Sequence, residues 1–60
     1  MKYAIYFTWK DDNFNDTFNV CNAKERDYEI KSMVARKEFS HIEYCPIFKS
    51  GEYGKCVTVI

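Results

Sequence analysis

The segment from Lys2 to Trp9 has the strongest strand pattern in the chain, because large aromatic and β-branched side chains alternate with milder ones. The large apolar side chains occupy the odd positions, Tyr3, Ile5, Phe7 and Trp9. The even positions hold Ala4, Tyr6 and Thr8. This alternation predicts a strand with one core-facing side and a second side that is neither clearly buried nor clearly hydrophilic.

A polar turn and a second strand follow. Lys10-Asp11-Asp12-Asn13 contains residues that form turns by hydrogen-bonding their own backbone. From Phe14 to Val20 the pattern alternates again, with Phe14, Phe18 and Val20 on one face. Asp16 interrupts the apolar row. Because the connection is short, we expect the two strands to pair antiparallel.

A helix is predicted from Ala23 to about Glu38. Asn22 is a good N-cap residue and is followed three positions later by Glu25, as in a capping box. No Gly or Pro interrupts this segment, and an apolar stripe recurs at helical spacing. The stripe consists of Ala23, Ile30, Met33 and Val34. Arg26 and Lys37 flank it and are expected to lay their methylene groups over the core.

The C-terminal third of the chain predicts a hairpin. Phe39-Ser40 is expected to be a short joint, with Phe39 closing the end of the helix. Strands are predicted from His41 to Phe48 and from Lys55 to Ile60, joined by a turn at Ser50-Gly51. Pro46 cannot donate a ladder hydrogen bond, so its part of the strand should face an edge or a bulge.

A two-residue turn fixes the register of this hairpin. The predicted pairs are Lys49 with Glu52, Phe48 with Tyr53, Cys45 with Cys56, Tyr44 with Val57, and Ile42 with Val59. Gly54 leaves a bulge or a four-residue loop as a competing register.

The predicted order of elements is ββαββ. We therefore expect one α+β domain spanning residues 1–60, a four-stranded antiparallel sheet with one helix packed on one face. Hydrophobic residues make up 47% of the chain, which is enough for a folded domain, but 60 residues bury little surface. Such a small chain often needs a disulfide, a metal ion or a second subunit.

One helix cannot cover both faces of the sheet, so the second face is the predicted interaction surface. Its expected members are Ala4, Tyr6, Thr8, Cys45, Ile47, Cys56 and Thr58. Apolar and aromatic patches of this kind commonly mark protein interfaces. A symmetric homodimer formed through this face would also compensate for the small core.

Charge and composition narrow the class of partner and the location. Nine basic and nine acidic residues give zero net charge, which disfavours non-specific nucleic-acid binding. No run is long enough to span a membrane, and no signal-peptide pattern is present, so we expect a cytoplasmic protein. Abundant Phe, Tyr, Ile, Asn and Lys are typical of AT-rich genomes. With the small size, this bias suggests a phage or mobile-element product that inhibits a host protein.

The cysteines and the histidine are candidate metal ligands and catalytic groups. Cys21, Cys45 and Cys56 with His41 give a Cys₃His count, but no Cys-x-x-Cys pair occurs. Cys45 and Cys56 would form a cross-strand disulfide in an oxidising compartment, whereas in a reducing one they remain free thiols, which we expect here. On one strand, His41 and Cys45 stand about 13 Å apart, too far for a nucleophile and its base. We expect His41 to be exposed at the start of its strand.

Other polar motifs have structural explanations. Asp11, Asp12 and Asp16 lack the glycine and terminal glutamate of a calcium loop and are interpreted as turn formers. Gly51-Glu52-Tyr53-Gly54 is similar to the Gly-aromatic-Gly core of an RNA-recognition strand, over a handful of residues. That resemblance would imply base stacking on Tyr6 and Tyr53, with phosphate contacts from Lys10, Lys49 and Lys55.

The sequence thus predicts a non-enzymatic interaction protein with no catalytic residues, no metal and no cofactor. The expected activity is binding of another macromolecule, as a homodimer. The alternative is a nucleic-acid-binding module that uses the aromatic residues of the sheet.

Overall fold

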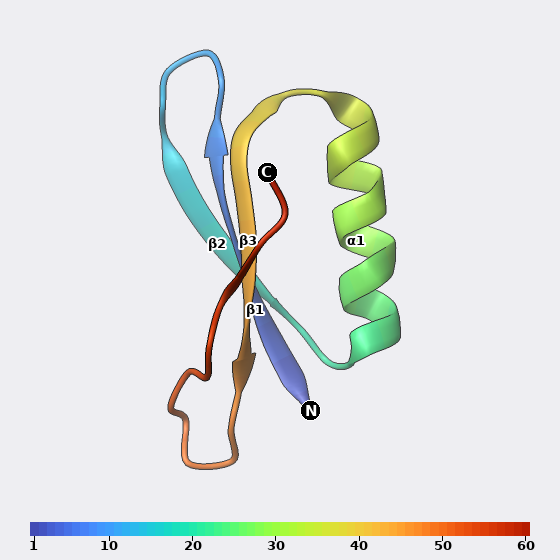
Figure 1. Ribbon diagram of the computed structural model, residues 1–60, viewed down its shortest axis with the longest axis vertical. Coiled ribbons are helices and arrows are strands. Elements are labelled where there is room, and N and C mark those ends of the chain that lie inside the picture. Colours follow the sequence, from blue (N-terminus) through green and yellow to red (C-terminus); the bar gives the residue numbers. More distant parts are fainter.

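A computed structural model describes residues 1–60 and contains four strands and one helix (Figure 1). The elements are β1 (Lys2–Trp9), β2 (Asn15–Val20), α1 (Ala23–Arg36), β3 (Phe39–Ile47) and β4 (Val57–Thr58). All neighbouring strands pair antiparallel, in the order β2-β1-β3-β4. The predicted α+β fold with ββαββ order is confirmed.

The helix lies on one side of the sheet, and no other element of secondary structure lies on the opposite side (Figure 1). Between helix and sheet, Ile5 of β1 and Ile42 of β3 are fully buried. The remaining members of this core are Phe7, Val20, Met33 and Phe39. Tyr3 and Trp9 pack at its border, so the odd positions of β1 form the core-facing side as predicted.

The first turn shifts the start of β2 by one residue relative to the prediction. Asn13 adopts a left-handed conformation with φ of 57°, and the backbone N–H of Phe14 donates to Oδ1 of Asp12 at 3.0 Å. These interactions hold Phe14 in the turn. Its side chain is exposed instead of lying beside Phe18 in the core.

The helix begins where the capping residue predicts and ends earlier than predicted. Oδ1 of Asn22 accepts a hydrogen bond from the backbone N–H of Glu25 at 2.8 Å. At the other end, Lys37 adopts a left-handed conformation, and its N–H bonds to the carbonyl oxygen of Val34 at 3.3 Å. This turn ends the helix at Arg36 instead of Glu38, because a left-handed residue directs the chain back toward the sheet.

The helix contacts the sheet through a narrower apolar stripe than predicted. Met33 is buried and Ile30 packs against the core, but Ala23 and Val34 are exposed. Instead, the guanidinium of Arg26 lies over the ring of Tyr3 at 4.6 Å and over that of Tyr44 at 4.7 Å.

Arginines therefore contribute to both ends of the helix–sheet interface. At the C-terminal end, Arg36 lies over the rings of Trp9 and Phe39 at 5.6 Å and 5.3 Å. A hydrogen bond from Arg26 to Asp27, opposed by partial desolvation, raises the pKa of the Arg26 guanidinium. Arg26 thus keeps the charge that attracts the faces of the two tyrosine rings.

Strand β3 starts two residues before the predicted position. Phe39 and Ser40 belong to the strand, and Phe39 pairs with Trp9 of β1. A shift of register between Thr8 and Trp9 accommodates this pair. Phe39 is buried and closes the core below the helix end, as predicted.

The last hairpin has the predicted register at its open end and a different one at its tip. Tyr44 pairs with Val57 as predicted. At the tip, Ile47 bridges Tyr53, so the predicted pairing of Phe48 with Tyr53 is wrong by one residue. The reason is a three-residue turn, in which Gly51 has φ of 89° and its N–H bonds to the carbonyl oxygen of Phe48.

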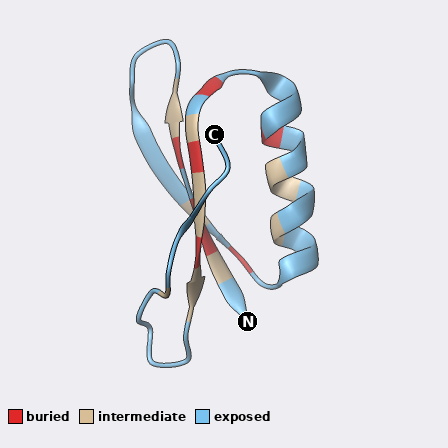
Figure 2. Ribbon diagram, viewed as in Figure 1, coloured by how far each residue is buried: buried red, intermediate tan, exposed pale blue.

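Gly54 lies between the two parts of the hairpin that pair in different registers, the Ile47–Tyr53 bridge and the Tyr44–Val57 pair. A Cβ atom at this position would lie 2.6 Å from Cγ of Pro46 and 2.7 Å from the ring of Phe48. Regular pairing resumes only at β4, so the final strand is shorter than the predicted Lys55–Ile60. As Figure 2 shows, most of the chain after β3 is exposed. No helix of the structure is both long enough and apolar enough to cross a membrane.

We predict that Phe7→Ala lowers the free energy of unfolding by about 3 to 5 kcal/mol, since a buried aromatic ring is removed from the centre of a small core. Urea or thermal denaturation followed by circular dichroism measures the change. The matched control is Tyr28→Ala, which removes an exposed aromatic ring from the helix and should change stability by less than about 0.5 kcal/mol. Similar losses in the two variants would contradict the assigned core.

Candidate functional site on the open face of the sheet

The open face is the side of the sheet that points away from the helix. Side chains alternate along a strand, so the even positions of β1 and the odd positions of β3 lie on it. Ala4 is opposite Cys45, Tyr6 is opposite Glu43, and Thr8 is opposite His41. On the other side of β1, Thr17 of β2 is opposite Tyr6.

A shallow hollow of about 410 Å³ lies on the open face. Its floor contains two buried residues, Ala4 and Cys45, which do not belong to the core beneath the helix. Tyr6 and Tyr53 are both partly exposed at its rim. The lining residues are Ala4, Tyr6, Thr17, Glu43, Cys45, Tyr53 and Cys56.

A disulfide bond joins Cys45 and Cys56 beside this hollow. The Cα atoms are 4.2 Å apart, as the predicted register of the hairpin requires. The expectation that these cysteines are free thiols is therefore wrong, and only Cys21 remains free. The disulfide attaches the final segment, whose strand β4 has only two residues, to the centre of the sheet.

A histidine–carboxylate pair lies next to the disulfide. Nε2 of His41 is 2.7 Å from Oε1 of Glu43, and the imidazole N–H donates to the carboxylate. His41 is partly buried, so the expectation of an exposed histidine is corrected. Glu43 lies between His41 and Cys45 on the same face of β3.

The structure brings four of the seven predicted interface residues together in the hollow: Ala4, Tyr6, Cys45 and Cys56. The other three lie outside it. The hydroxyl of Thr8 donates to Oδ1 of Asn15 at 2.6 Å, Ile47 lines a different hollow, and Thr58 is an exposed residue opposite Glu43.

Three lining residues were not among the predicted interface residues: Thr17, Glu43 and Tyr53. Glu43 was detectable, because it occupies the position between His41 and Cys45 in the alternating pattern of β3. Thr17 follows from the pairing of β2 with Tyr6. The irregular tip of the hairpin brings Tyr53 to the hollow, and the two-residue alternation of a regular strand does not predict its position.

A carboxylate oxygen of Glu43 and the Sγ atoms of Cys45 and Cys56, which are potential metal ligands, lie within 4.8 Å of one another. Cys21 is outside this group, so the Cys₃His set considered from the sequence is not assembled. While the disulfide is intact, both sulfurs are bonded to each other and are not available as thiolate ligands.

The aspartates near the first turn act as hydrogen-bond acceptors for the backbone. Oδ1 of Asp12 accepts from Phe14, and Oδ1 of Asp16 accepts from the N–H of Thr17 at 2.8 Å. The interpretation as a turn former is confirmed for Asp12, whereas Asp16 lies within β2 and not in the turn.

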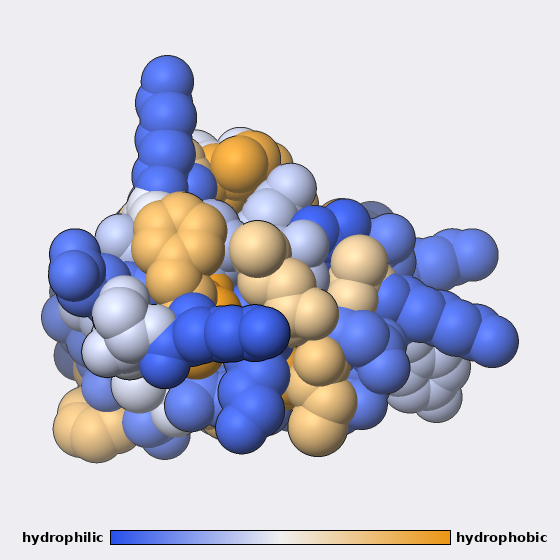
Figure 3. Space-filling model, turned by 90° about the horizontal axis from the view of Figure 1, so that it is seen from below, coloured by the Kyte–Doolittle hydropathy of each residue, from blue (hydrophilic) through white to orange (hydrophobic).

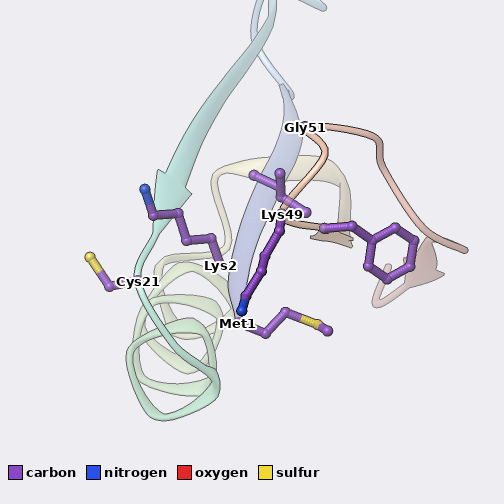
Figure 4. Close-up of a pocket in the computed structure, with 7 residues that line it drawn as sticks. Met1, Lys2, Cys21, Lys49 and Gly51 are labelled. Carbon is purple, nitrogen blue, oxygen red and sulfur yellow. The ribbon is translucent and has the colours of Figure 1, made fainter.

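A second hollow, of about 590 Å³, lies at the end of the molecule that carries the N-terminus. Figure 4 shows the side chain of Lys49 extending toward Met1, with Cys21 farther away, beyond Lys2. Figure 3 views this end of the molecule and shows hydrophobic side chains interspersed with hydrophilic ones. Because the lining side chains do not converge on one point, this hollow offers no defined constellation for binding or chemistry.

Comparisons with known proteins supply no relative for this fold and site. No model of a protein family matches the chain, and the searches of curated proteins and of solved structures found no significant match.

We predict that reducing the disulfide lowers the free energy of unfolding by about 3 kcal/mol, because the bond closes a loop with a sequence separation of 11 residues. Denaturation with and without a dithiol reductant measures this difference. Cys56→Ser should reproduce the loss, whereas Cys21→Ser should have little effect because Cys21 is an exposed free thiol. Stability that is unchanged by reduction would show that the bond does not hold the hairpin.

Proposed function

We propose that this chain is a small, non-enzymatic interaction protein that binds another macromolecule as a homodimer, and that the two copies associate through the open face of the sheet. The observation that carries the proposal is the hollow on that face, where Tyr6 and Tyr53 stand partly exposed around a buried floor. Aromatic side chains around a buried centre are typical of protein interfaces.

The small core supports association. Only eight of the 60 residues are buried in the isolated chain. Covering the open face in a dimer would remove the exposed tyrosine rings from water and add a second buried layer. Zero net charge means that two copies repel each other little at long range.

The edges of the sheet are less suited to association than its open face. One edge is β2, with the sequence NDTFNV and a carboxylate at Asp16. The other edge is β4, which is only two residues long. Short and polar edge strands discourage pairing with another sheet.

The hydrogen bond between His41 and Glu43 also favours a face-to-face contact. An unpaired carboxylate would be costly to bury in an interface. Because the imidazole already donates to Glu43, part of that cost is offset before any partner binds.

The alternative, nucleic-acid binding, has weaker support. Tyr6 and Tyr53 do share one hollow, as base stacking would require. However, the carboxylate of Glu43 lines the same hollow and would repel phosphate. Lys10 lies in the turn after β1 and Lys49 in the turn after β3, at opposite ends of the sheet, so they do not form a continuous basic track (Figure 1).

A non-enzymatic role is consistent with the arrangement of the reactive groups. The sulfurs of Cys45 and Cys56 are bonded to each other, and Nε2 of His41 is directed to Glu43. None of these groups forms the nucleophile–base pair of a catalytic site. The narrower hypothesis of a phage-type inhibitor of a host protein stays a prediction from composition and size.

We predict that Tyr6→Glu weakens self-association at least about tenfold, because it introduces an unpaired charge into the contact without touching the helix-side core. Light scattering over a concentration series should show wild-type chains approaching twice the 7.2 kDa monomer mass. The matched control is Tyr28→Glu on the outer surface of the helix, which should dimerise like the wild type.

Two results would count against the homodimer. One is a wild-type chain that stays monomeric across the whole concentration series. The other is equal weakening by Tyr6→Glu and Tyr28→Glu, which would mean that the contact is not on the open face. Circular dichroism of both variants checks that each remains folded.

A further inference from the structure

Glu43, Cys45 and Cys56 bring together one carboxylate and two cysteine sulfurs, which are groups that bind metal ions. In the structure the two sulfurs are bonded to each other as a disulfide. Glu43 and Cys45 are alternate residues of β3 and point to the same face. Cys56 comes from the final segment, opposite Cys45. The three side chains place their oxygen and sulfur atoms within 4.8 Å of one another.

We propose that reduction of the Cys45–Cys56 disulfide creates a binding site for one zinc ion. The ligands are Sγ of Cys45, Sγ of Cys56 and a carboxylate oxygen of Glu43. Two thiolates with one carboxylate form a donor set that zinc accepts, and a tetrahedral ion then retains a fourth position for water. This site goes beyond the proposed interaction and does not require a second copy of the chain.

The backbone already has the spacing that such a site needs. A tetrahedral zinc ion with Zn–S bonds of about 2.3 Å separates its two sulfur ligands by about 3.8 Å. Because the Cα atoms of Cys45 and Cys56 are 4.2 Å apart, rotation of the side chains is enough to reach this separation. Cys56 is exposed, so a reductant and a metal ion can approach from solvent.

The chemistry balances with a dithiol reductant. The reductant's two thiols form their own disulfide and supply two electrons and two protons, which convert the Cys45–Cys56 bond into two thiols. Zinc then displaces one proton from each thiol, and the two protons pass to solvent. Oxidation of Cys45 and Cys56 by an added disulfide compound, which is itself reduced to two thiols, restores the disulfide bond and releases the ion.

In this site, His41 would hold the carboxylate of Glu43 in position by a hydrogen bond. Its Nε2 is 2.7 Å from Oε1 of Glu43, and a carboxylate has two oxygens, so Glu43 can bind His41 and a metal at once. Carboxylates that ligate metals are commonly held by such hydrogen bonds. No sequence motif marks this site, because the two cysteines are 11 residues apart and do not form the close Cys-x-x-Cys pair of most structural zinc sites.

The experiment titrates zinc into the wild-type chain in competition with a chromophoric chelator, in the oxidised form and after reduction by a non-thiol phosphine that is then removed. We expect one zinc ion per reduced chain and no stoichiometric binding by the oxidised chain. Replacing zinc with cobalt should give a thiolate-to-metal charge-transfer band, which reports direct sulfur ligation.

Variants then identify the ligands. Loss of an outer hydrogen bond to a ligand weakens metal affinity about 10- to 100-fold, so His41→Phe should fall in this range. Cys56→Ser and Glu43→Gln remove ligands and should weaken binding more than His41→Phe does. Cys21→Ser is the matched control and should bind zinc like the wild type.

The proposal is overturned if the reduced wild-type chain binds zinc no more tightly than the oxidised chain, or if the cobalt complex lacks the thiolate band. It is also overturned if Cys21→Ser weakens binding as much as Cys56→Ser. If reduction unfolds the chain, recovery of the native circular dichroism on adding zinc supports the site. Failure to recover it contradicts the site.

Discussion

The rest of the structure depends on the contact between a single 14-residue helix and one face of a four-stranded sheet. Ile5 and Ile42 lie on the two central strands and are fully buried beneath that helix. A single helix leaves the other face of the sheet without a covering layer. The small size of the chain therefore has two consequences. The core buries little apolar surface, and one face of the sheet remains exposed.

The helix–sheet contact is completed by arginine side chains as well as by apolar ones. Arg26 lies over Tyr3 and Tyr44, and Arg36 lies over Trp9 and Phe39, so the two ends of the interface are closed by cation–aromatic contacts. On the opposite face, the disulfide has a comparable role. It holds an irregular segment against the sheet where the backbone ladder has only two residues of regular pairing.

The sequence predicted those parts of the fold that depend on local patterns. Alternation in β1 identified Tyr3, Ile5, Phe7 and Trp9 as the core side, and Asn22 located the start of the helix. The helix end was missed because the left-handed conformation of Lys37 involves neither glycine nor asparagine, the usual signals. The tip of the last hairpin was missed because Gly51 and Gly54 permit several registers.

The candidate site could be predicted only in part, for a similar reason. Ala4, Tyr6 and Cys45 follow from alternation along regular strands, and Cys56 follows from the register near β4. Tyr53 depends on the irregular hairpin, which no period describes. Whether Cys45 and Cys56 are bonded depends on the redox environment as well as on their distance. The odd number of cysteines and the expectation of a reducing compartment led to the wrong prediction.

One face of the sheet forms the core, and we propose that the other forms the binding surface. The most direct measurement is a series of amide NMR spectra recorded over a wide range of protein concentrations. If the open face is the binding surface, resonances of Tyr6, Glu43 and Tyr53 should shift with concentration while those of Tyr28 and its helical neighbours stay constant. Shifts confined to the helix, or no shift at any position, would contradict it.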